Sequence, residues 1–332
     1  MPGEQPRAGR RVVKLNTNEN PYPPSPRVLD ALAAAVNGGL RLYPDPDAHG
    51  LRTRAAAAYG VSPDHVLAGN GSDECLGLLV RAIVDAGDRV AFPVPTYSFY
   101  ETLVAAQGGT AVRMPWPSDF TLPGELATSG ARLTFLCNPN SPSGTLVPNA
   151  AIEELARRLD GVLVVDEAYV DFARESAMPL VTRHPNVVVL RTFSKSFSLA
   201  GLRIGLAFGH PDLLAGLRMV KDSYNLDRLA LVAAEAALED LDHMRANVAR
   251  VRATRARLAR ALADLGFSVL PSEANFVLAR RAGTDLAPLT RALSSRDVLV
   301  RHFPTPELRD ALRITVGTDE EIDVLLAALR EL

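Results

Sequence analysis

The fold of this chain is decided by the stretch Val187-Val-Val-Leu-Arg-Thr-Phe-Ser-Lys-Ser-Phe-Ser-Leu-Ala-Gly-Leu-Arg203. Its first four residues are apolar, which is typical of a strand buried on both faces of a sheet. Lys195 should then emerge just past the carboxyl end of that strand, where open α/β sheets place their chemistry. Most lysines are solvated surface charges, but the small or apolar neighbours of Lys195 favour a desolvated amine with a lowered pKa.

An amine of this kind can be captured by a carbonyl cofactor as a Schiff base. Ser194 and Arg203 flank it at spacings that suit a phosphate group. A second contact for the same phosphate is predicted where the strand-like His65-Val-Leu-Ala68 leads into Gly69-Asn-Gly-Ser-Asp73 and then into an apolar helix over residues 74–84. Glycines let the backbone approach an anion and the N–H groups of a first helical turn hold it, although such turns are also common in loops without a ligand.

Another continuous apolar run, Val162-Leu-Val-Val165, ends in Asp166-Glu-Ala-Tyr169. A carboxylate at such a strand end can pair with a protonated pyridine nitrogen. The alternative for Asp166 is a helix cap or an ordinary loop acid. Tyr169 could donate a hydrogen bond to the phenolate oxygen of the same ring, and the two residues together favour the cofactor interpretation.

Two further loops complete this predicted site. Tyr97 follows the strand-like Arg89-Val-Ala-Phe92, where it could stack on a planar cofactor or could be a core or surface aromatic residue. The turn Asn138-Pro-Asn-Ser-Pro-Ser-Gly144 follows a buried strand over residues 133–137 and is too rich in Pro, Asn and Gly to be an element of its own. Its side-chain amides could bind a ring oxygen, although a turn needs no function.

With these motifs the chain resembles the fold-type I aminotransferases that depend on pyridoxal 5'-phosphate, and within that group the histidinol-phosphate aminotransferases. The resemblance spans nearly the whole chain. It is carried by Leu15-Asn-Thr-Asn-Glu-Asn-Pro-Tyr22, Tyr43-Pro-Asp45, Gly71-Ser-Asp-Glu74, Pro95-Thr-Tyr97, Asp166-Glu-Ala-Tyr169, Ser194-Lys195 and Leu312-Arg-Ile-Thr-Val-Gly317.

The resemblance implies a role for each matched residue. Lys195 would bind the cofactor covalently and move a proton at the substrate, Asp166 would keep the ring nitrogen protonated, and Tyr169 would bond the ring oxygen. Tyr97 would stack on the ring. The cofactor phosphate would be held by Gly71, Ser72, Asp73, Ser194 and Arg203. Tyr43 would reach the phosphate site of a neighbouring subunit, which implies a homodimer with shared active sites.

Two positions depart from the family pattern. The family commonly has Asn directly before the Pro-Thr-Gly of the loop at residues 138–144, whereas this chain has Ser141 at that position. The contact with the ring oxygen can therefore come from Asn138, from Asn140 or from the Ser141 hydroxyl. Near the N-terminus, Tyr22 stands slightly later than in some relatives, and its predicted role is in substrate binding.

Arg301 and Arg313 are the other candidate substrate-binding residues. They accompany strand-like runs at residues 298–300 and 312–316, and guanidinium forks suit carboxylates and phosphates alike. The alternative for each is a structural ion pair with one of the chain's acids. In the resembled family these positions bind the substrate phosphate, whereas most aminotransferases use the residue that corresponds to Arg313 for an α-carboxylate.

The implied reaction moves an amino group between L-histidinol phosphate and 2-oxoglutarate, forming imidazole-acetol phosphate and L-glutamate in histidine biosynthesis. The alternative is an aromatic or broad-specificity amino-acid aminotransferase. A decarboxylase of a phosphorylated amino acid on the same fold is a further alternative. A cofactor-binding regulator without activity is disfavoured, because Lys195, Asp166 and Tyr169 are all present and no DNA-binding segment is added.

The length of 332 residues predicts two domains, because single cores rarely grow so large. Strands and helices alternate from about residue 60 to 210, which predicts an α/β large domain with a mainly parallel sheet and helices on both faces. One amphipathic helix over residues 244–265 and the strand-like runs beyond it predict a smaller α+β domain. We expect the large cofactor-binding domain at residues 29–225 and the small domain at 226–332, joined by an N-terminal arm at residues 1–28.

Composition predicts an ordinary globular enzyme of the cytoplasm. The net charge of −2 gives no general attraction to nucleic acid or to an anionic membrane. No apolar run is long enough to span a bilayer, and the first ten residues lack the apolar segment of a signal peptide. Six histidines without ligand spacing and two cysteines in apolar surroundings give no reason to expect a metal. The expected partners are a small-molecule amino donor, a 2-oxo acid acceptor and a second copy of the chain.

Overall fold

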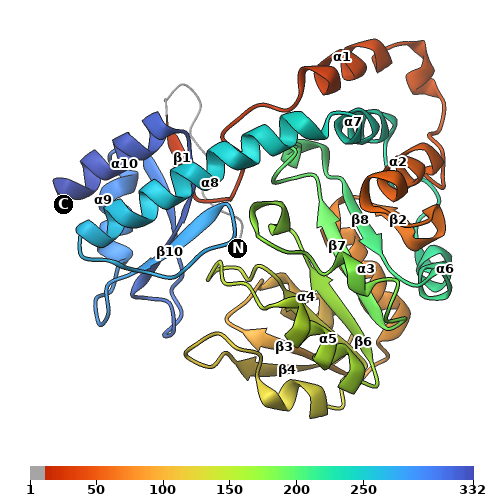
Figure 1. Ribbon diagram of the computed structural model, residues 1–332, viewed down its shortest axis with the longest axis horizontal. Coiled ribbons are helices and arrows are strands. Elements are labelled where there is room, and N and C mark those ends of the chain that lie inside the picture. The colour runs from red at the N-terminus through yellow and green to blue at the C-terminus, as the bar shows by residue number, and fades with distance from the viewer. Residues whose placement is uncertain (1–11) are drawn as a thin grey trace.

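The computed structural model describes residues 12–332, which contain two β-sheets (Figure 1). Residues 1–11 of the predicted N-terminal arm lie outside the described residues. The larger sheet has seven strands in the order β2-β8-β7-β6-β5-β3-β4. Their bounds are β2 (Val66–Gly69), β3 (Arg89–Val94), β4 (Thr110–Pro115), β5 (Leu133–Cys137), β6 (Val162–Asp166), β7 (Val187–Thr192) and β8 (Gly205–Phe208). β8 runs antiparallel to both of its neighbours, and the other paired strands are parallel.

Helices cover both faces of this sheet. On β6, the side chains of Leu163 and Val165 enter one core and that of Val164 enters the other, as the alternation of a strand requires. The first face is covered by α2 (His49–Tyr59), α5 (Asn149–Arg158) and α7 (Arg228–Leu238), and the second by α3 (Gly71–Ile83), α4 (Phe99–Ala106) and α6 (Pro211–Val220). The predicted α/β fold with a mainly parallel sheet is confirmed.

The second sheet has five strands in the order β1-β11-β12-β10-β9. Their bounds are β1 (Val13–Leu15), β9 (Ser268–Val269), β10 (Phe276–Arg280), β11 (Val298–His302) and β12 (Ala311–Thr315). β1 comes from the N-terminal arm and pairs in parallel with β11, so that Val13 lies opposite Val298. The sheet packs with α8 (Leu241–Asp264), α9 (Ala287–Ser294) and α10 (Asp319–Arg330), which gives the smaller α+β layer that the sequence predicts.

The long helix α8 connects the two sheets. Figure 1 shows it running from the end of α7 to the five-stranded sheet. Val251, Leu258 and Leu262 place its apolar face in the core of the smaller sheet. α7, by contrast, packs against α1 (Pro26–Ala35) and belongs to a core of the larger sheet. The domain boundary between residues 225 and 226 stays a prediction, and it would separate α7 from the core that this helix helps to form.

Three further observations hold for residues 12–332. None of the helices there combines the length and the apolar character needed to cross a membrane. No group of three or more His, Cys, Asp or Glu side chains in that range could hold a metal ion. Cys75 and Cys137 are both buried free thiols.

Candidate active site

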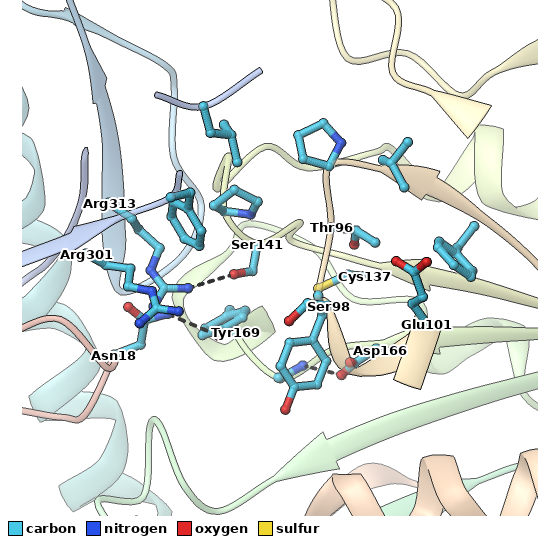
Figure 2. Close-up of a pocket in the computed structure, with 18 of the residues that line it drawn as sticks. Asn18, Thr96, Ser98, Glu101, Cys137, Ser141, Asp166, Tyr169, Arg301 and Arg313 are labelled. Atoms are coloured by element: carbon cyan, nitrogen blue, oxygen red, sulfur yellow. Dashed lines mark hydrogen bonds between the residues drawn. The ribbon is translucent and has the colours of Figure 1, made fainter. Parts of the chain in front are cut away.

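A cavity of about 700 Å³ lies where the carboxyl ends of the parallel strands face the smaller sheet. Its walls come from the loops that follow β2, β3, β5, β6 and β7, from β11 and β12, and from the N-terminal arm. Figure 2 shows Arg301 and Arg313 on one side of the cavity and Asp166 on the other. The crevice outside the carboxyl ends of the strands is where open α/β sheets bind their ligands.

Lys195 follows β7, whose six residues are all buried, and its side chain lines the cavity. Its Nζ lies 3.5 Å from the carbonyl oxygen of Thr17 and 5.8 Å from the centre of the Tyr169 ring. Burial, with the positive charge of Arg313 as the next cause, lowers the pKa of Lys195 to about 8. A fraction of the amine is therefore unprotonated near neutral pH and able to attack a carbonyl carbon.

Asp166 ends β6 and is 3% exposed. Its carboxylate accepts a hydrogen bond of 2.7 Å from the Tyr100 hydroxyl and one of 3.3 Å from the backbone N–H of Ala168. Burial raises the pKa of Asp166 to about 6, and the bond from Tyr100 opposes this rise. A carboxylate kept from water in this way is stabilised by a cationic group that enters the cavity.

Tyr169 lies three residues beyond Asp166 and is also buried. Its ring packs edge-on against Phe276, with the ring centres 5.0 Å apart. Its phenol oxygen accepts a hydrogen bond of 3.1 Å from the side-chain amide of Asn18. Burial raises the pKa of Tyr169, so the phenol stays neutral and keeps a proton to donate.

The loop after β2 places the first turn of α3 at the edge of the cavity. Gly71 begins this helix with a φ of 78°, a left-handed conformation that favours glycine. Gly205 of β8 faces the same turn, and a Cβ atom there would lie 2.3 Å from the backbone nitrogen of Ser72. The Ser72 side chain lines the cavity, and the N–H groups of this turn form a seat for an anion.

Arg203 and Asp73 lie beside this anion seat. Arg203 donates to the Ser194 hydroxyl at 3.3 Å and forms an ion pair of 3.0 Å with Asp73. Asp73 also accepts a hydrogen bond of 3.0 Å from the Tyr97 hydroxyl. All four side chains line the cavity, so the residues predicted to hold a phosphate and the ring predicted to stack on a cofactor lie together.

The side chains of Asn138 and Asn140 do not line the cavity. Asn138 donates to the backbone carbonyl of Val147 at 3.1 Å and accepts from its N–H at 2.8 Å. The amide of Asn140 makes three hydrogen bonds with other residues. Ser141 lines the cavity instead, and its hydroxyl accepts a bond of 3.0 Å from Arg313. Of the three residues that the sequence left open, this geometry favours Ser141, because it is the one that lines the cavity and its hydroxyl still has a proton to donate.

Tyr22 and Tyr43 lie outside the cavity. The guanidinium of Arg250 on α8 covers the ring of Tyr22, 3.5 Å from its centre. Tyr43 is 78% exposed and stacks on Tyr224, with the ring centres 4.3 Å apart. The roles of Tyr22 in substrate binding and of Tyr43 in a neighbouring subunit stay predictions.

Arg301 and Arg313 lie directly opposite each other on the antiparallel strands β11 and β12, and both line the cavity. Besides its bond to Ser141, Arg313 donates to the backbone carbonyl of Asn16 at 3.1 Å. Its Nε is buried without a hydrogen-bond partner among residues 12–332. Burial lowers the pKa of Arg313, and the charge of Arg301 adds to this effect. Two adjacent guanidinium groups suit a ligand with more than one negative charge.

Sequence reasoning did not single out Tyr100 or Asn18. Tyr100 lies in the first turn of α4, three positions after Tyr97, and its phenol donates to Asp166 while its ring packs edge-on against that of Tyr97. Tyr97 precedes α4, so no helical period links the two residues and no local signal pointed to Tyr100. Asn18 reaches the site from the N-terminal arm, far from Tyr169 in the sequence, and no local pattern predicts the contact.

Comparison with known proteins agrees with this geometry. Residues 10–329 match the family model described as aminotransferase class I and II. The chain is 46% identical over 333 residues to histidinol-phosphate aminotransferase 1 of Trichormus variabilis, covering 100% of this chain and 95% of that protein. It is 48% identical over 339 residues to histidinol-phosphate aminotransferase 2 of Burkholderia mallei, with the same coverage of 100% and 95%. It is similar in structure to histidinol-phosphate aminotransferase from Sinorhizobium meliloti in complex with pyridoxal-5'-phosphate, with a TM-score of 0.90 and 34% identity over 97% of this chain and 91% of that one.

This chain therefore belongs to the aminotransferase class I and II family. The family resemblance that the sequence motifs carry is confirmed, and so is the predicted class of enzyme. The cavity that contains Lys195, Asp166 and Tyr169 is the candidate active site of this aminotransferase.

Proposed function

We propose that this enzyme transfers an amino group between L-histidinol phosphate and 2-oxoglutarate, forming imidazole-acetol phosphate and L-glutamate in histidine biosynthesis. The observation that carries the substrate is the opposed pair Arg301 and Arg313 on the wall of the cavity that contains Lys195. A phosphate ester has close to two negative charges at neutral pH and can engage both guanidinium groups. Identity of 46% over the full length to a protein named for this substrate supports the proposal.

We propose pyridoxal 5'-phosphate as the cofactor, because the residues of the cavity fit it. Asp166 offers a buried carboxylate to the ring nitrogen, and Lys195 offers an amine of lowered pKa to the aldehyde carbon. Tyr97 would lie against the ring face, and Tyr169 would donate to the ring oxygen. The anion seat at the first turn of α3, together with Ser194 and Arg203, would hold the phosphate. When bound, this group supplies an electron sink for negative charge that develops at the substrate carbon.

Side chains of the cavity account for binding and for the movement of protons. Lys195 is the base that would take the proton from the reacting carbon of the substrate and deliver it to the aldehyde carbon of the cofactor, on the other side of the transferred nitrogen. A pKa of about 8 keeps both protonation states of its amine populated near neutral pH. Arg301 and Arg313 bind the anionic end of the substrate and so orient the reacting carbon towards Lys195. Asp166 would supply the negative charge that keeps the ring nitrogen of the cofactor protonated.

Arg301→Ala and Arg313→Ala are each expected to lower kcat/KM for histidinol phosphate by about ten- to a hundredfold, because each removes a charge-assisted contact. Histidinol without the phosphate should be a poorer substrate of the unchanged enzyme. The kcat/KM for phenylalanine, which has no phosphate, should fall less in Arg301→Ala than the kcat/KM for histidinol phosphate. The measurement is kcat/KM for these three substrates in the wild type and in both variants.

Arg260→Ala is the matched control for this series, because Arg260 lies on the exposed side of α8 and outside the cavity. It should leave kcat/KM for all three substrates unchanged. Equal efficiency of the wild type on histidinol phosphate and histidinol would contradict phosphate recognition and favour an aromatic or broad-specificity aminotransferase. Release of carbon dioxide from a phosphorylated amino acid, without amino transfer, would identify a decarboxylase; histidinol phosphate has no carboxyl group to lose.

We further propose that the active unit is a homodimer with shared active sites. The support is a set of large apolar side chains, each at least 48% exposed, in the segments 29–43 and 219–224. They are Leu29, Val36, Leu40, Leu42, Tyr43, Met219 and Tyr224. The stack of Tyr43 on Tyr224 joins the two segments. Soluble monomers rarely expose many large apolar side chains together, and a second copy of the chain would cover them.

Mixed dimers test the shared site. A subunit with Lys195→Ala and a subunit with Tyr43→Phe are each expected to be impaired as homodimers, whereas their heterodimer has one site that carries neither change. We expect this heterodimer to recover about half of the wild-type activity, because one of its two sites is intact. Tyr224→Phe in place of Tyr43→Phe is the control for a mere change in the apolar surface. Isolated heterodimers without recovered activity would argue that each subunit builds its site alone.

A further inference from the structure

Asn18 lies between the two sheets and is 1% exposed. Its backbone N–H donates to the hydroxyl oxygen of Thr315 at 2.9 Å, and the same hydroxyl donates to the side-chain oxygen of Asn18 at 3.0 Å. Its backbone carbonyl accepts a bond of 2.9 Å from the side chain of Asn275. Thr315 and Asn275 are buried as well, so residues of the smaller sheet fix the position of Asn18.

These contacts decide which end of the Asn18 amide faces Tyr169. The Thr315 hydroxyl accepts the backbone N–H, so its one proton is available for the side-chain oxygen of Asn18. The amide nitrogen must then face Tyr169, and it donates to the phenol oxygen at 3.1 Å, as the dashed line in Figure 2 marks. A phenol oxygen that accepts in this way keeps its own proton for a second partner. Within residues 12–332, no second hydrogen bond of this oxygen is formed, and Tyr169 lines the cavity.

We propose that Asn18 is a positioning residue, which holds Tyr169 as a hydrogen-bond donor directed at the oxygen of the cofactor ring. This inference rests on the proposed function, because it requires pyridoxal 5'-phosphate in the cavity. The N–H that Asn18 donates also polarises the phenol, and chains of hydrogen bonds strengthen one another. Through this one amide, the N-terminal arm and the smaller sheet act on the chemistry at the ends of the parallel strands.

Several elements bring titratable groups near the Tyr169 phenol. They are Arg313 on β12, Asp166 at the end of β6, Cys137 at the end of β5, Tyr97 after β3 and Lys195 after β7. Asn18 carries no charge, and its effect depends on the direction of one hydrogen bond. Asn18→Asp reverses this direction but also adds a negative charge, so the effect of the hydrogen bond is separated from that charge by making the same change in Tyr169→Phe.

The test is a pH titration of the visible absorbance of the holoenzyme. A hydrogen bond donated to the ring oxygen draws negative charge from it. This lowers the pKa of the proton that the Lys195 nitrogen and the cofactor share. Asn18→Asp puts an acceptor in place of the N–H and turns the Tyr169 proton towards the arm. We expect the pKa of the absorbance change to rise by about one unit. Asn18 has a φ of 59°, a conformation in which Asp is tolerated.

Two further variants check the orientation of the amide. Thr315→Val removes the hydroxyl that orients Asn18 without touching the arm, and it should raise the same pKa by a smaller amount. It also keeps the proposal testable if Asn18→Asp fails to fold, which thermal unfolding will show. Asn186→Asp is the matched control, because this side-chain amide is also a hydrogen-bond donor, to the backbone carbonyls of Ala156 and Gly161 near the amino end of β7 and outside the cavity. It should leave the absorbance titration unchanged.

Tyr169→Phe separates a failure of this inference from a failure of the proposed function. It should raise the pKa at least as much as Asn18→Asp does, and the double variant should match Tyr169→Phe alone. If the pKa of the absorbance change in the Tyr169→Phe holoenzyme equals that of the wild type, the assumed contact between Tyr169 and the cofactor is overturned. A shift in Tyr169→Phe without one in Asn18→Asp would overturn the role of Asn18 alone. So would an Asn18→Asp shift that persists in full after the phenol is removed.

Discussion

Lys195→Ala is expected to lower kcat/KM for amino transfer by about four orders of magnitude. Lys195 is the single lysine among the described residues that line the cavity, so no second lysine can take over its proton transfers. The change should leave folding nearly unaffected, because the apolar residues of β7 that anchor this loop remain. The measurement is kcat/KM with histidinol phosphate and 2-oxoglutarate, together with thermal unfolding of the variant.

Lys221→Ala is the matched control for the loss of a lysine. The Lys221 ammonium bonds the carbonyl of Pro46 and the side chain of Asn225, outside the cavity, so this variant should keep its activity. Addition of a small primary amine to Lys195→Ala should restore part of the lost rate, because a free amine can accept the same proton. A Lys195→Ala enzyme within about tenfold of the wild type would remove this residue from the mechanism.

Asp166→Asn is expected to lower kcat by about 10²- to 10³-fold, which is the usual effect of removing one preorganised electrostatic contact from an active site. An amide cannot hold a proton on the ring nitrogen by charge. Negative charge at the substrate carbon is then less well stabilised, and the chemical step slows. Single-turnover rates measure this step directly. Wild-type rates in the variant would show that Asp166 does not pair with the ring nitrogen.

The same change should not lower the stability of the apoprotein near about pH 8. Burial raises the pKa of Asp166 from 3.8 to about 6, so the neutral form is the one that favours folding. The neutral carboxyl contributes its full stabilisation below pH 3.8. This contribution is lost as the pH rises through about 6. Above that range its buried charge opposes folding, and Asn removes the charge.

Glu167→Gln is the matched control for Asp166→Asn, because Glu167 is the next residue and is equally buried. Its carboxylate pairs with Arg191 at 3.6 Å and accepts hydrogen bonds from Ser176 and from the backbone of Ala177. It does not line the cavity. Its replacement should therefore change thermal stability more than turnover, which is the reverse of the pattern expected for Asp166.

The strands that were predicted well are those buried on both faces. The apolar runs at residues 133–137, 162–165 and 187–190 became β5, β6 and β7, with ends that differ by at most two residues. β4 was not predicted, because it is half exposed at the edge of the sheet and its side chains give no clear pattern. β8 has four residues, too few to show a period.

The site residues also fall into those that the local sequence reveals and those that it does not. Lys195, Asp166 and the turn at Gly71 stand at the ends of strands, and the end of a strand is visible in the local sequence. The contacts of Asn18 depend on the pairing of β1 with β11, which no local pattern encodes. Asn138 was a candidate because of its residue type, but turn amides often bind their own backbone, as this one does.

The pairing of β1 with β11 also has a consequence for synthesis of the chain. Val13 leaves the ribosome long before Val298, its neighbour in the sheet, and at ordinary elongation rates the delay is roughly 15–60 s. All seven strands of the larger sheet are made before this interval ends, whereas β1 has no β11 to pair with until then. Arg313 is made later still. A nascent or C-terminally truncated chain therefore has an incomplete cavity, and activity begins only after the last strand has joined.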